Sequence, residues 1–301
     1  MRLRGPAEKS KPQEFSLHFF QEVYIPFAIV NPKFIGFLIL EWFVEERDNS
    51  QDKEGITGDS LFDGDLTCCQ HTAGYRFSID AVLLAHFAEV RRGDRILDLG
   101  TGCGIIMLIL LYRWGERIQE VVGLEIQEGL TDLAASNLKV NGLGQKGRVL
   151  AGDIKKILDL VPAESFDTVV CNPPFYQCGS GRESDNTEAK LARHQCLATL
   201  DDFLQASAAA VRNKGSVYCI YPAGQIARFT VLASRYRLEV KKLQFIYGYP
   251  QEESEARLVL VHCLKNGGTG TKILPPFYVY SQKNGAFSPE MQKFYQKNIV
   301  L

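Results

Sequence analysis

The sequence predicts an α/β fold built on a doubly wound, mainly parallel sheet of seven strands whose last strand runs antiparallel. Three observations lead to this fold class. From residue 95 onward, short apolar segments alternate with helical ones. The strand segments are almost continuous in Val, Ile and Leu, as expected for strands covered on both faces. The last two strand segments have no helix between them, so the seventh strand should run antiparallel.

Each element is predicted from its own pattern. Strands are expected at residues 95–100, 120–126, 148–153, 166–171, 215–221, 238–247 and 257–264. Helices are expected at residues 105–114, 128–141, 201–212 and 225–235. The first helix is apolar on all sides, which indicates that it is buried. The second is amphipathic, with Leu130, Leu133 and Leu138 on one face. The third follows Thr199 and begins with two aspartates, a favourable start for a helix.

The chain of 301 residues is long enough for one α/β domain with additions at both ends. We divide it into an N-terminal extension and linker at 1–58, the α/β domain at 59–265, and a C-terminal tail at 266–301 that packs on the domain. The polar, glycine-containing segment 45–60 indicates the linker, and we expect the extension before it to be poorly ordered.

The extension contains an apolar run at 27–44. A bilayer-spanning helix needs about 20 apolar residues, and Pro32, Lys33 and Glu41 interrupt this run. No small-residue cleavage site follows it, as a secretory signal would require. We therefore expect neither a membrane span nor a signal peptide.

Composition narrows the class of protein. The formal net charge is −1, so a nucleic-acid partner would need a local basic patch. Two groups of basic residues are candidates: Arg228, Arg235, Arg237, Lys241 and Lys242, and Arg91, Arg92 and Arg95. The eight cysteines form no C-x-x-C pair, and several lie in apolar runs, as reduced thiols of a cytoplasmic protein do. No metal site is expected from this spacing.

A glycine-rich turn follows the first predicted strand of the parallel sheet. Residues 98–104 read DLGTGCG, and ligands of open α/β sheets bind at such strand ends. A dinucleotide fingerprint would continue with glycine at the position of Ile105, so the turn does not match a pyrophosphate site. S-adenosylmethionine has no phosphate but has a cationic sulfonium, an amino-acid tail and an adenosine. Asp98 is suited to face the cationic end of that molecule.

Two more acids lie at predicted strand ends. Glu125 ends the second strand, 21 residues after Gly104, where a carboxylate can accept from two ribose hydroxyls. Asp153 ends the third strand, where it can accept from the adenine amino group. These features predict S-adenosylmethionine as cofactor. The alternative is a glycine turn with acids that only cap strand ends.

The fourth strand ends in Asn172-Pro173-Pro174-Phe175. The prolines stiffen the turn and leave their carbonyls free to accept hydrogen bonds. The Asn172 Oδ1 and the Pro173 carbonyl could accept both hydrogens of a planar amino group and aim its lone pair at a methyl sulfonium. Phe175 could stack on the ring that carries the amino group. The motif predicts methyl transfer to a planar nitrogen without a strong base; a plain Pro-Pro turn is the alternative.

These motifs together resemble the class I amino-methyltransferases. More narrowly, four stretches are similar to the bacterial tRNA(Val) (adenine-N6)-methyltransferase family: residues 77–85 (FSIDAVLLA), 172–176 (NPPFY), 192–194 (ARH) and 275–280 (PPFYVY). The resemblance covers residues 60–296 and implies a Rossmann-like fold, in which 59–265 would be the S-adenosylmethionine-dependent domain. It implies a cytoplasmic enzyme that methylates the N6 amine of the tRNA adenine just 3′ of the anticodon, with no DNA, membrane or metal partner.

The resemblance also implies roles for individual residues. The implied cofactor-binding residues are Asp80, Asp98, Gly100, Gly102, Gly104, Glu125 and Asp153. The implied holders of the target base are Asn172, Pro173, Pro174 and Phe175, with Tyr176 and Arg193 in weaker contact with the substrate. Asp80 begins a predicted helix and would lie near the methionine tail of the cofactor; a simple helix cap is the alternative.

Several alternatives stay open at this point. The glycine- and serine-rich segment 177–190 follows the Asn-Pro-Pro-Phe motif and is a candidate lid. Within the same chemistry, the acceptor could be guanine N2 in rRNA or a glutamine amide in a protein, since both present a planar NH₂ group. Outside it, the chain could be a nicotinamide-dependent oxidoreductase or a non-catalytic scaffold on the same fold.

Overall fold

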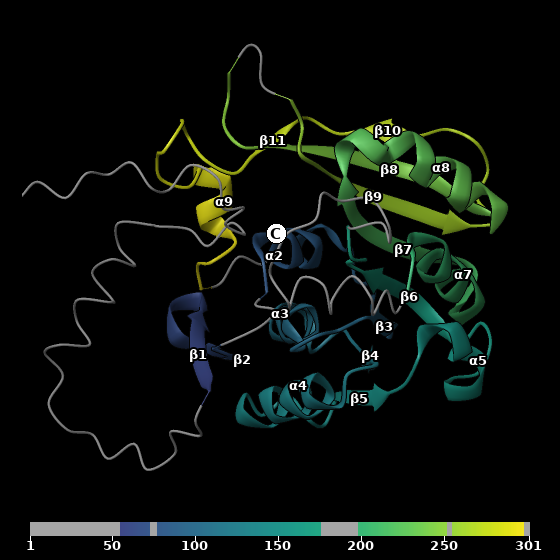
Figure 1. Ribbon diagram of the computed structural model, residues 1–301, viewed down its shortest axis with the longest axis horizontal. Helices are drawn as coiled ribbons and strands as arrows, with labels where there is room; N and C mark the ends of the chain where they lie inside the picture. The colour runs from purple at the N-terminus through teal and green to yellow at the C-terminus, as the bar shows by residue number, and fades with distance from the viewer. Residues whose placement is uncertain (1–54, 73–76, 176–197, 252–254, 298–301) are drawn as a thin grey trace, which may run out of the picture.

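The computed structural model describes residues 55–72, 77–175, 198–251 and 255–297 (Figure 1). Its main sheet has nine strands, in the order β10-β8-β9-β7-β6-β3-β4-β5, with β11 also paired to β8. The seven long strands are β3 (Arg95–Leu99), β4 (Glu120–Glu125), β5 (Gly147–Ala151), β6 (Phe166–Cys171), β7 (Val211–Pro222), β8 (Leu238–Tyr247) and β9 (Leu258–Lys265). Neighbours from β5 to β7 are parallel, and β9 is antiparallel to both β7 and β8. The predicted fold class is confirmed.

Helices cover both faces of this sheet. On one face lie α2 (Ile79–Phe87), α3 (Ile105–Trp114) and α4 (Glu128–Val140), whose buried residues share a core with Ile96 and Val170. On the other face lie α5 (Ile157–Leu160), α7 (Leu200–Ala210) and α8 (Ile226–Arg235), in a second core with Leu97 and Val169. Successive strand residues point to opposite faces, so Val169 and Val170 enter different cores. This is why the strands are apolar at consecutive positions.

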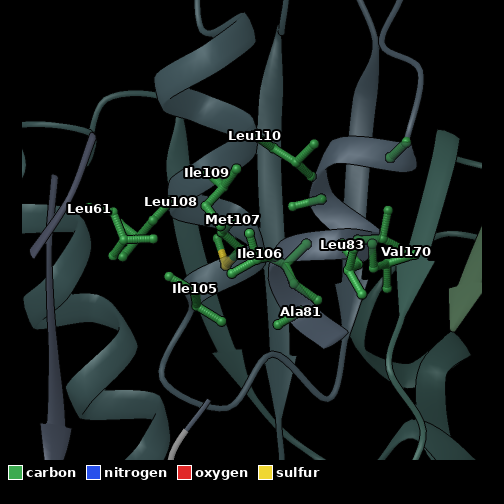
Figure 2. Close-up of a cluster of buried hydrophobic side chains, with 14 of the residues drawn as sticks. Leu61, Ala81, Leu83, Ile105, Ile106, Met107, Leu108, Ile109, Leu110 and Val170 are labelled. Atoms are coloured by element: carbon green, nitrogen blue, oxygen red, sulfur yellow. The ribbon is translucent and has the colours of Figure 1, made fainter. Parts of the chain in front are cut away.

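Helix α3 is buried along its first seven residues, Ile105 to Leu111, each at most 4% exposed (Figure 2). It contacts α2, α4, β4 and the hairpin strand β2 (Leu66–His71), so no side of it faces solvent over that length. Gly123 in β4 lets α3 approach closely, because a Cβ at this position would lie 2.4 Å from the Met107 sulfur. The all-apolar pattern of 105–114 therefore has the expected cause.

A hairpin precedes the first predicted strand. It consists of β1 (Ile56–Leu61), the 3-10 turn η1 (Phe62–Gly64) and β2, paired antiparallel. The expectation of a linker at 45–60 is wrong for its last five residues, which belong to β1. Five of the six β1 residues are exposed or half-buried, so the segment looks like a linker in sequence. The hairpin lies beside α3 and α4 (Figure 1).

Two asparagines, one in α4 and one at its C-cap, hold the hairpin in place. Asn137 accepts from the Cys69 N–H at 2.8 Å and donates to the Cys69 carbonyl at 3.0 Å. One helical turn later, Asn141 accepts from the Thr67 N–H at 2.9 Å and donates to the Thr67 carbonyl at 2.7 Å. The outward-facing backbone groups of β2 are therefore satisfied by side chains.

The C-terminal residues pack along the other edge of the molecule. The short strands β10 (Lys272–Ile273) and β11 (Phe277–Tyr278) pair in parallel with β8, and α9 (Pro289–Lys293) follows. Met291 of α9 is fully buried, and Phe294 stacks on His86 of α2 with ring centroids 4.0 Å apart. These strands were not predicted, because two residues show no periodicity. Among the described helices, none combines the length and apolar character that crossing a bilayer requires.

Candidate cofactor and methyl-acceptor site

The candidate site lies at one edge of the sheet, where β3, β4 and β6 end side by side. Leu99 pairs with Leu124 of β4 on one side and with Cys171 of β6 on the other. The next residue of each strand is therefore at the same level: Gly100 in the centre, flanked by Glu125 and Asn172. The parallel topology thus brings the glycine turn, one acid and the Asn-Pro-Pro-Phe motif together, as expected for an open α/β sheet.

The glycine turn is held in a left-handed conformation. Gly100, Gly102 and Gly104 have φ of 70°, 58° and 85°, values that other residues adopt only with strain. The Gly100 and Thr101 N–H groups both donate to the Leu124 carbonyl, which fastens the turn to β4. A Cβ at Gly100 would approach the Phe203 ring at 3.2 Å, whereas one at Gly102 would meet nothing within 4 Å. The backbone at Gly102 therefore borders open space, where a ligand can approach it.

Asp98 lies fully buried beneath this turn. Its Oδ2 accepts from the Thr101 hydroxyl at 2.6 Å, while its Oδ1 is buried without a hydrogen-bond partner among the described residues. Burial raises the pKa of Asp98 to about 7, against the lowering effect of the Thr101 hydrogen bond and with a smaller raising effect from the Glu125 charge. A buried carboxyl with an unpaired oxygen is a group that a cationic ligand would stabilise in its ionised form.

Glu125, the last residue of β4, connects its strand to the turn. Its Oε2 accepts from the Gly102 N–H at 3.0 Å, and its Oε1 accepts from the backbone N–H groups of Ile126 and Gln127, also at 3.0 Å. The side chain is only 6% exposed. A carboxylate has about four acceptor positions, and three of them are occupied here. One is left for a ligand hydroxyl, whereas the sequence predicted that Glu125 would accept from two ribose hydroxyls.

The remaining two acids lie at helix starts. Asp153 follows β5 by two residues instead of ending it, and its Oδ1 accepts from the Lys155 N–H at 2.9 Å to cap the 3-10 helix η2 (Ile154–Lys156). Asp80 is the second residue of α2. Burial raises its pKa, opposed by a hydrogen bond with Ser78. Asp153 therefore acts as a local cap, whereas Asp80 lies in the first turn of a helix whose N-cap is Ser78. Contact of either acid with a cofactor stays a prediction.

The Asn-Pro-Pro-Phe motif directly follows β6 and lies outside any helix or strand. Asn172 is half-buried, Pro173 is buried and Pro174 is exposed. The half-buried Phe175 ring meets Tyr221 of β7 edge to face, with centroids 6.0 Å apart and planes at 89°. Tyr221 therefore braces the ring that we expect to stack on the acceptor.

Tyr221 was not among the residues predicted for the site. Cys171 pairs with Cys219, and Tyr221 follows two residues later. Only the register of β6 and β7 brings it next to the motif. Tyr176, Arg193 and the lid expected at 177–190 lie outside the described residues.

Most of the predicted basic residues lie at the opposite edge of the sheet. Arg91 and Arg92 precede β3, which Arg95 begins. Arg235 ends α8, and Arg237 directly precedes β8, which begins at that same edge. Lys242 in β8 pairs with Glu89. The exception is Arg228 in the first turn of α8, just after β7 ends at the site. Its charge acts on Tyr221, where it lowers the pKa of the phenol against the larger raising effect of burial.

Comparison with known proteins adds a family to this geometry. Residues 78–221 match the methyltransferase small domain. This part of the chain is similar to that domain. The match contains the glycine turn, Glu125 and the Asn-Pro-Pro-Phe motif, and it sets aside the oxidoreductase and the non-catalytic scaffold.

Curated relatives of the methyltransferase domain carry a more specific name. A protein of Flavobacterium johnsoniae named tRNA1(Val) (adenine(37)-N6)-methyltransferase is 27% identical over 191 residues, which cover 63% of this chain and 79% of that one. A protein of the same name from Porphyromonas gingivalis is 27% identical over 240 residues, which cover 76% and 89%. A crystal structure of a predicted O-methyltransferase from Agrobacterium tumefaciens is similar to this chain with a TM-score of 0.56 at 21% identity. The similarity covers 72% of this chain and 95% of that one, and it shows the shared fold.

The methyl donor of such a domain is S-adenosylmethionine. The site residues fit this cofactor on two counts. The unpaired Asp98 Oδ1 suits a cationic ligand, and the space bordered by Gly102 leaves the turn accessible. Within the described residues no three His, Cys, Asp or Glu side chains gather as metal ligands would.

Proposed function

We propose that this protein transfers a methyl group from S-adenosylmethionine to the exocyclic N6 amine of an adenine in tRNA. The observation that carries the proposal is the Asn172-Pro173-Pro174-Phe175 segment at the end of β6, next to the glycine turn that ends β3. The names of the curated relatives support the acceptor, adenine 37 of tRNA1(Val).

Bound S-adenosylmethionine would supply an electrophilic methyl group. Asp98 and the turn would hold its charged end, and the free acceptor position of Glu125 would take a ribose hydroxyl. These contacts orient the cofactor; the protein adds no covalent chemistry of its own. Asp80 and Asp153 would complete the cofactor site.

On the acceptor side, Asn172 Oδ1 and the Pro173 carbonyl would accept the two amine hydrogens. An amine held in this way is turned out of conjugation with its ring, so its lone pair points at the methyl group. Phe175, braced by Tyr221, would stack on the adenine and keep its plane fixed. The methylated nitrogen is acidic and loses a proton to water, so no buried base is required. Pro174, Tyr176 and Arg193 would complete the acceptor site.

For the RNA itself, Arg228 is the basic residue best situated for phosphate contact, since it begins α8 at the site edge. With a net charge of −1 the chain should neutralise few phosphates, so binding should be modest and strongly weakened by salt. An anticodon-loop adenine is unpaired, and presenting it requires no base-pair opening. We place the protein in the cytoplasm, where such a substrate is made and used.

The test measures transfer of labelled methyl from S-adenosylmethionine to three acceptors: unmodified tRNA(Val), rRNA and a glutamine-containing peptide. We expect label in tRNA and at N6 of adenine 37, and none in a transcript with guanine at that position. Label in rRNA or peptide and none in tRNA would overturn the acceptor. Label in no acceptor, together with no cofactor binding in calorimetry, would overturn the enzyme assignment at this site.

Asn172 provides the matched variants. Asn172→Ala removes one acceptor of the amine hydrogens and should reduce kcat by about 10²–10³-fold, as for other positioned hydrogen-bonding groups. Cofactor affinity should change less than threefold, because Asn172 lies on the acceptor side. Arg235→Ala, at the opposite edge of the sheet, should leave both quantities unchanged. Equal losses in the two variants would show that the Asn172 effect is not specific.

A further inference from the structure

Two cysteine sulfurs meet behind the glycine turn. Cys103 lies within the turn, between Gly102 and Gly104, and Cys68 lies on β2 of the hairpin. Their Sγ atoms are 3.7 Å apart. Cys68 is fully buried and Cys103 is 5% exposed, so the pair is reached only from the Cys103 side. The contact joins two segments separated by 35 positions in the sequence.

The two thiols differ in chemistry. Cys103 accepts from the backbone N–H of Ile105 at the start of α3, and a helix N-terminus favours a thiolate. The hydrogen bond from Cys68 has the largest effect and lowers the pKa of Cys103, while the same bond and burial raise the pKa of Cys68. Cys103 is therefore the thiol of the pair that reacts first with an oxidant, and Cys68 is the thiol that can then attack the oxidised Cys103 sulfur.

We propose that Cys68 and Cys103 form a reversible disulfide that pulls the glycine turn toward the hairpin and weakens S-adenosylmethionine binding. The inference rests on the proposed use of this turn as the cofactor site. The oxidant class is a hydroperoxide. The Cys103 thiolate attacks the peroxide oxygen to give a sulfenic acid and releases water or an alcohol. The Cys68 sulfur then attacks the Cys103 sulfur and the second oxygen leaves as water, so two thiols and one peroxide give one disulfide.

Bond formation requires movement, and the structure indicates which side moves. The sulfurs must approach from 3.7 Å to about 2.05 Å, a shift of about 1.7 Å. Asn137 holds both segments, because it bonds to Cys69 of the hairpin and donates to the Cys103 carbonyl at 2.9 Å. Asn141 anchors the hairpin in addition, whereas Cys103 is flanked by two glycines in the left-handed conformation. The turn should therefore yield. Its neighbour Gly102 donates to Glu125, so the shift also disturbs that acid.

A binding group displaced by about 1 Å exceeds the roughly 0.5 Å tolerance of a preorganised site. We expect the oxidised protein to bind S-adenosylmethionine about tenfold more weakly. By linkage, bound S-adenosylmethionine must disfavour formation of the disulfide by the same factor of about ten. At saturating S-adenosylmethionine the midpoint potential of the pair should therefore rise by about 30 mV, since tenfold corresponds to 29.6 mV for two electrons.

The experiment uses the full chain, fully reduced and then treated with hydrogen peroxide. Mass spectrometry after alkylation and digestion should identify a Cys68–Cys103 linked peptide, and calorimetry should give the tenfold weaker affinity, restored by dithiothreitol. Cys68→Ala should bind S-adenosylmethionine normally when reduced and should lose the reversible response. Cys263→Ala is the matched control, because Cys263 is equally buried but lies in the other core, and it should behave as the unmodified protein does.

Three results would overturn the proposal: no linked peptide, a linked peptide without change in affinity, or an equal peroxide response in Cys68→Ala. Linked peptides can be sought in the unmodified chain, so the inference stays testable if Cys68→Ala does not fold. Neither measurement uses RNA. Reduced protein that binds S-adenosylmethionine but methylates no tRNA would contradict the proposed acceptor alone, and the disulfide would stand or fall by the linked peptide and the affinity.

Discussion

Replacement of Asp98 by asparagine tests the electrostatics of the cofactor site. The side chain is fully buried, one oxygen is bonded to Thr101, and the other has no partner among the described residues. Asparagine has nearly the same shape, and its Oδ1 can accept the same hydrogen bond. It cannot ionise, however. The variant therefore removes a buried charge and leaves the packing almost unchanged.

The magnitude follows from the pKa of Asp98, raised from 3.8 to about 7 by burial. The folded protein binds this proton more tightly than the unfolded chain does. The contribution of protonated Asp98 to the free energy of unfolding is therefore fully present below about pH 4. It falls as the pH rises from about 4 to about 7 and stays lower above that. A difference of about 3 pH units corresponds to roughly 4 kcal/mol, an upper limit. At pH 8 Asp98→Asn should be more stable by up to about 4 kcal/mol, and at pH 4 the two proteins should be about equally stable.

Cofactor binding should change in the opposite direction. A charge-assisted contact contributes about 1.5–3 kcal/mol, so Asp98→Asn should bind S-adenosylmethionine roughly 10–150-fold more weakly at pH 8. Below pH 7 the unmodified protein must first lose a proton, and its affinity should fall up to tenfold per pH unit; the variant should show no such slope. Urea unfolding and calorimetry at pH 5 and pH 8 measure both effects. A variant that is less stable at pH 8, or that keeps the slope, would refute the reasoning.

Three further predictions concern the scaffold. Asn137→Ala removes the side-chain partner of three backbone groups, two part-buried at Cys69 and one buried at Cys103, and should lower the free energy of unfolding by about 3 kcal/mol in urea melts. Gly123→Ala forces a Cβ to within 2.4 Å of the Met107 sulfur and should destabilise the protein by about 1–3 kcal/mol. At Gly129 an added Cβ meets nothing within 4 Å, so Gly129→Ala should stabilise helix α4 by up to about 1 kcal/mol. Thermal melts of the two variants compare these effects. Burial, assisted by a nearby arginine, lowers the pKa of His86 to about 3, so stability is lost as the pH falls below 6.5. His86→Phe should remove at most about 2 kcal/mol of that loss at pH 5, and an unchanged acid profile would contradict this.

Much of the fold was predictable because its strands are buried on both faces. The segment 166–171 and the helix 105–114 begin and end where expected, since apolar residues fill them and polar ones flank them. The hairpin was missed for the opposite reason. Strand β1 is mostly exposed and carries no clear alternation, and it becomes a strand through its partner β2, which Asn137 of α4 holds in place.

The candidate site shows the same limit. The glycine turn, Glu125 and Asn172 follow buried strands directly, so parallel topology alone brings them together. Tyr221 and Cys68 reach the site through strand register and through the unpredicted hairpin. The hydrogen bonds that occupy Glu125 depend on the path of the chain after β4, which no sequence pattern specifies.

The pairing of α4 with β2 has a consequence for the behaviour of the protein in solution. Residues four apart on a helix rise about 6.0 Å, and residues two apart on a strand rise about 6.8 Å. Asn137 and Asn141 can therefore serve Cys69 and Thr67 as a neighbouring strand would. An uncovered strand edge is a template on which other chains add strands and aggregate. Here two amide groups occupy the β2 edge, so the hairpin lies beside the cofactor turn without offering the backbone of that edge to a second molecule.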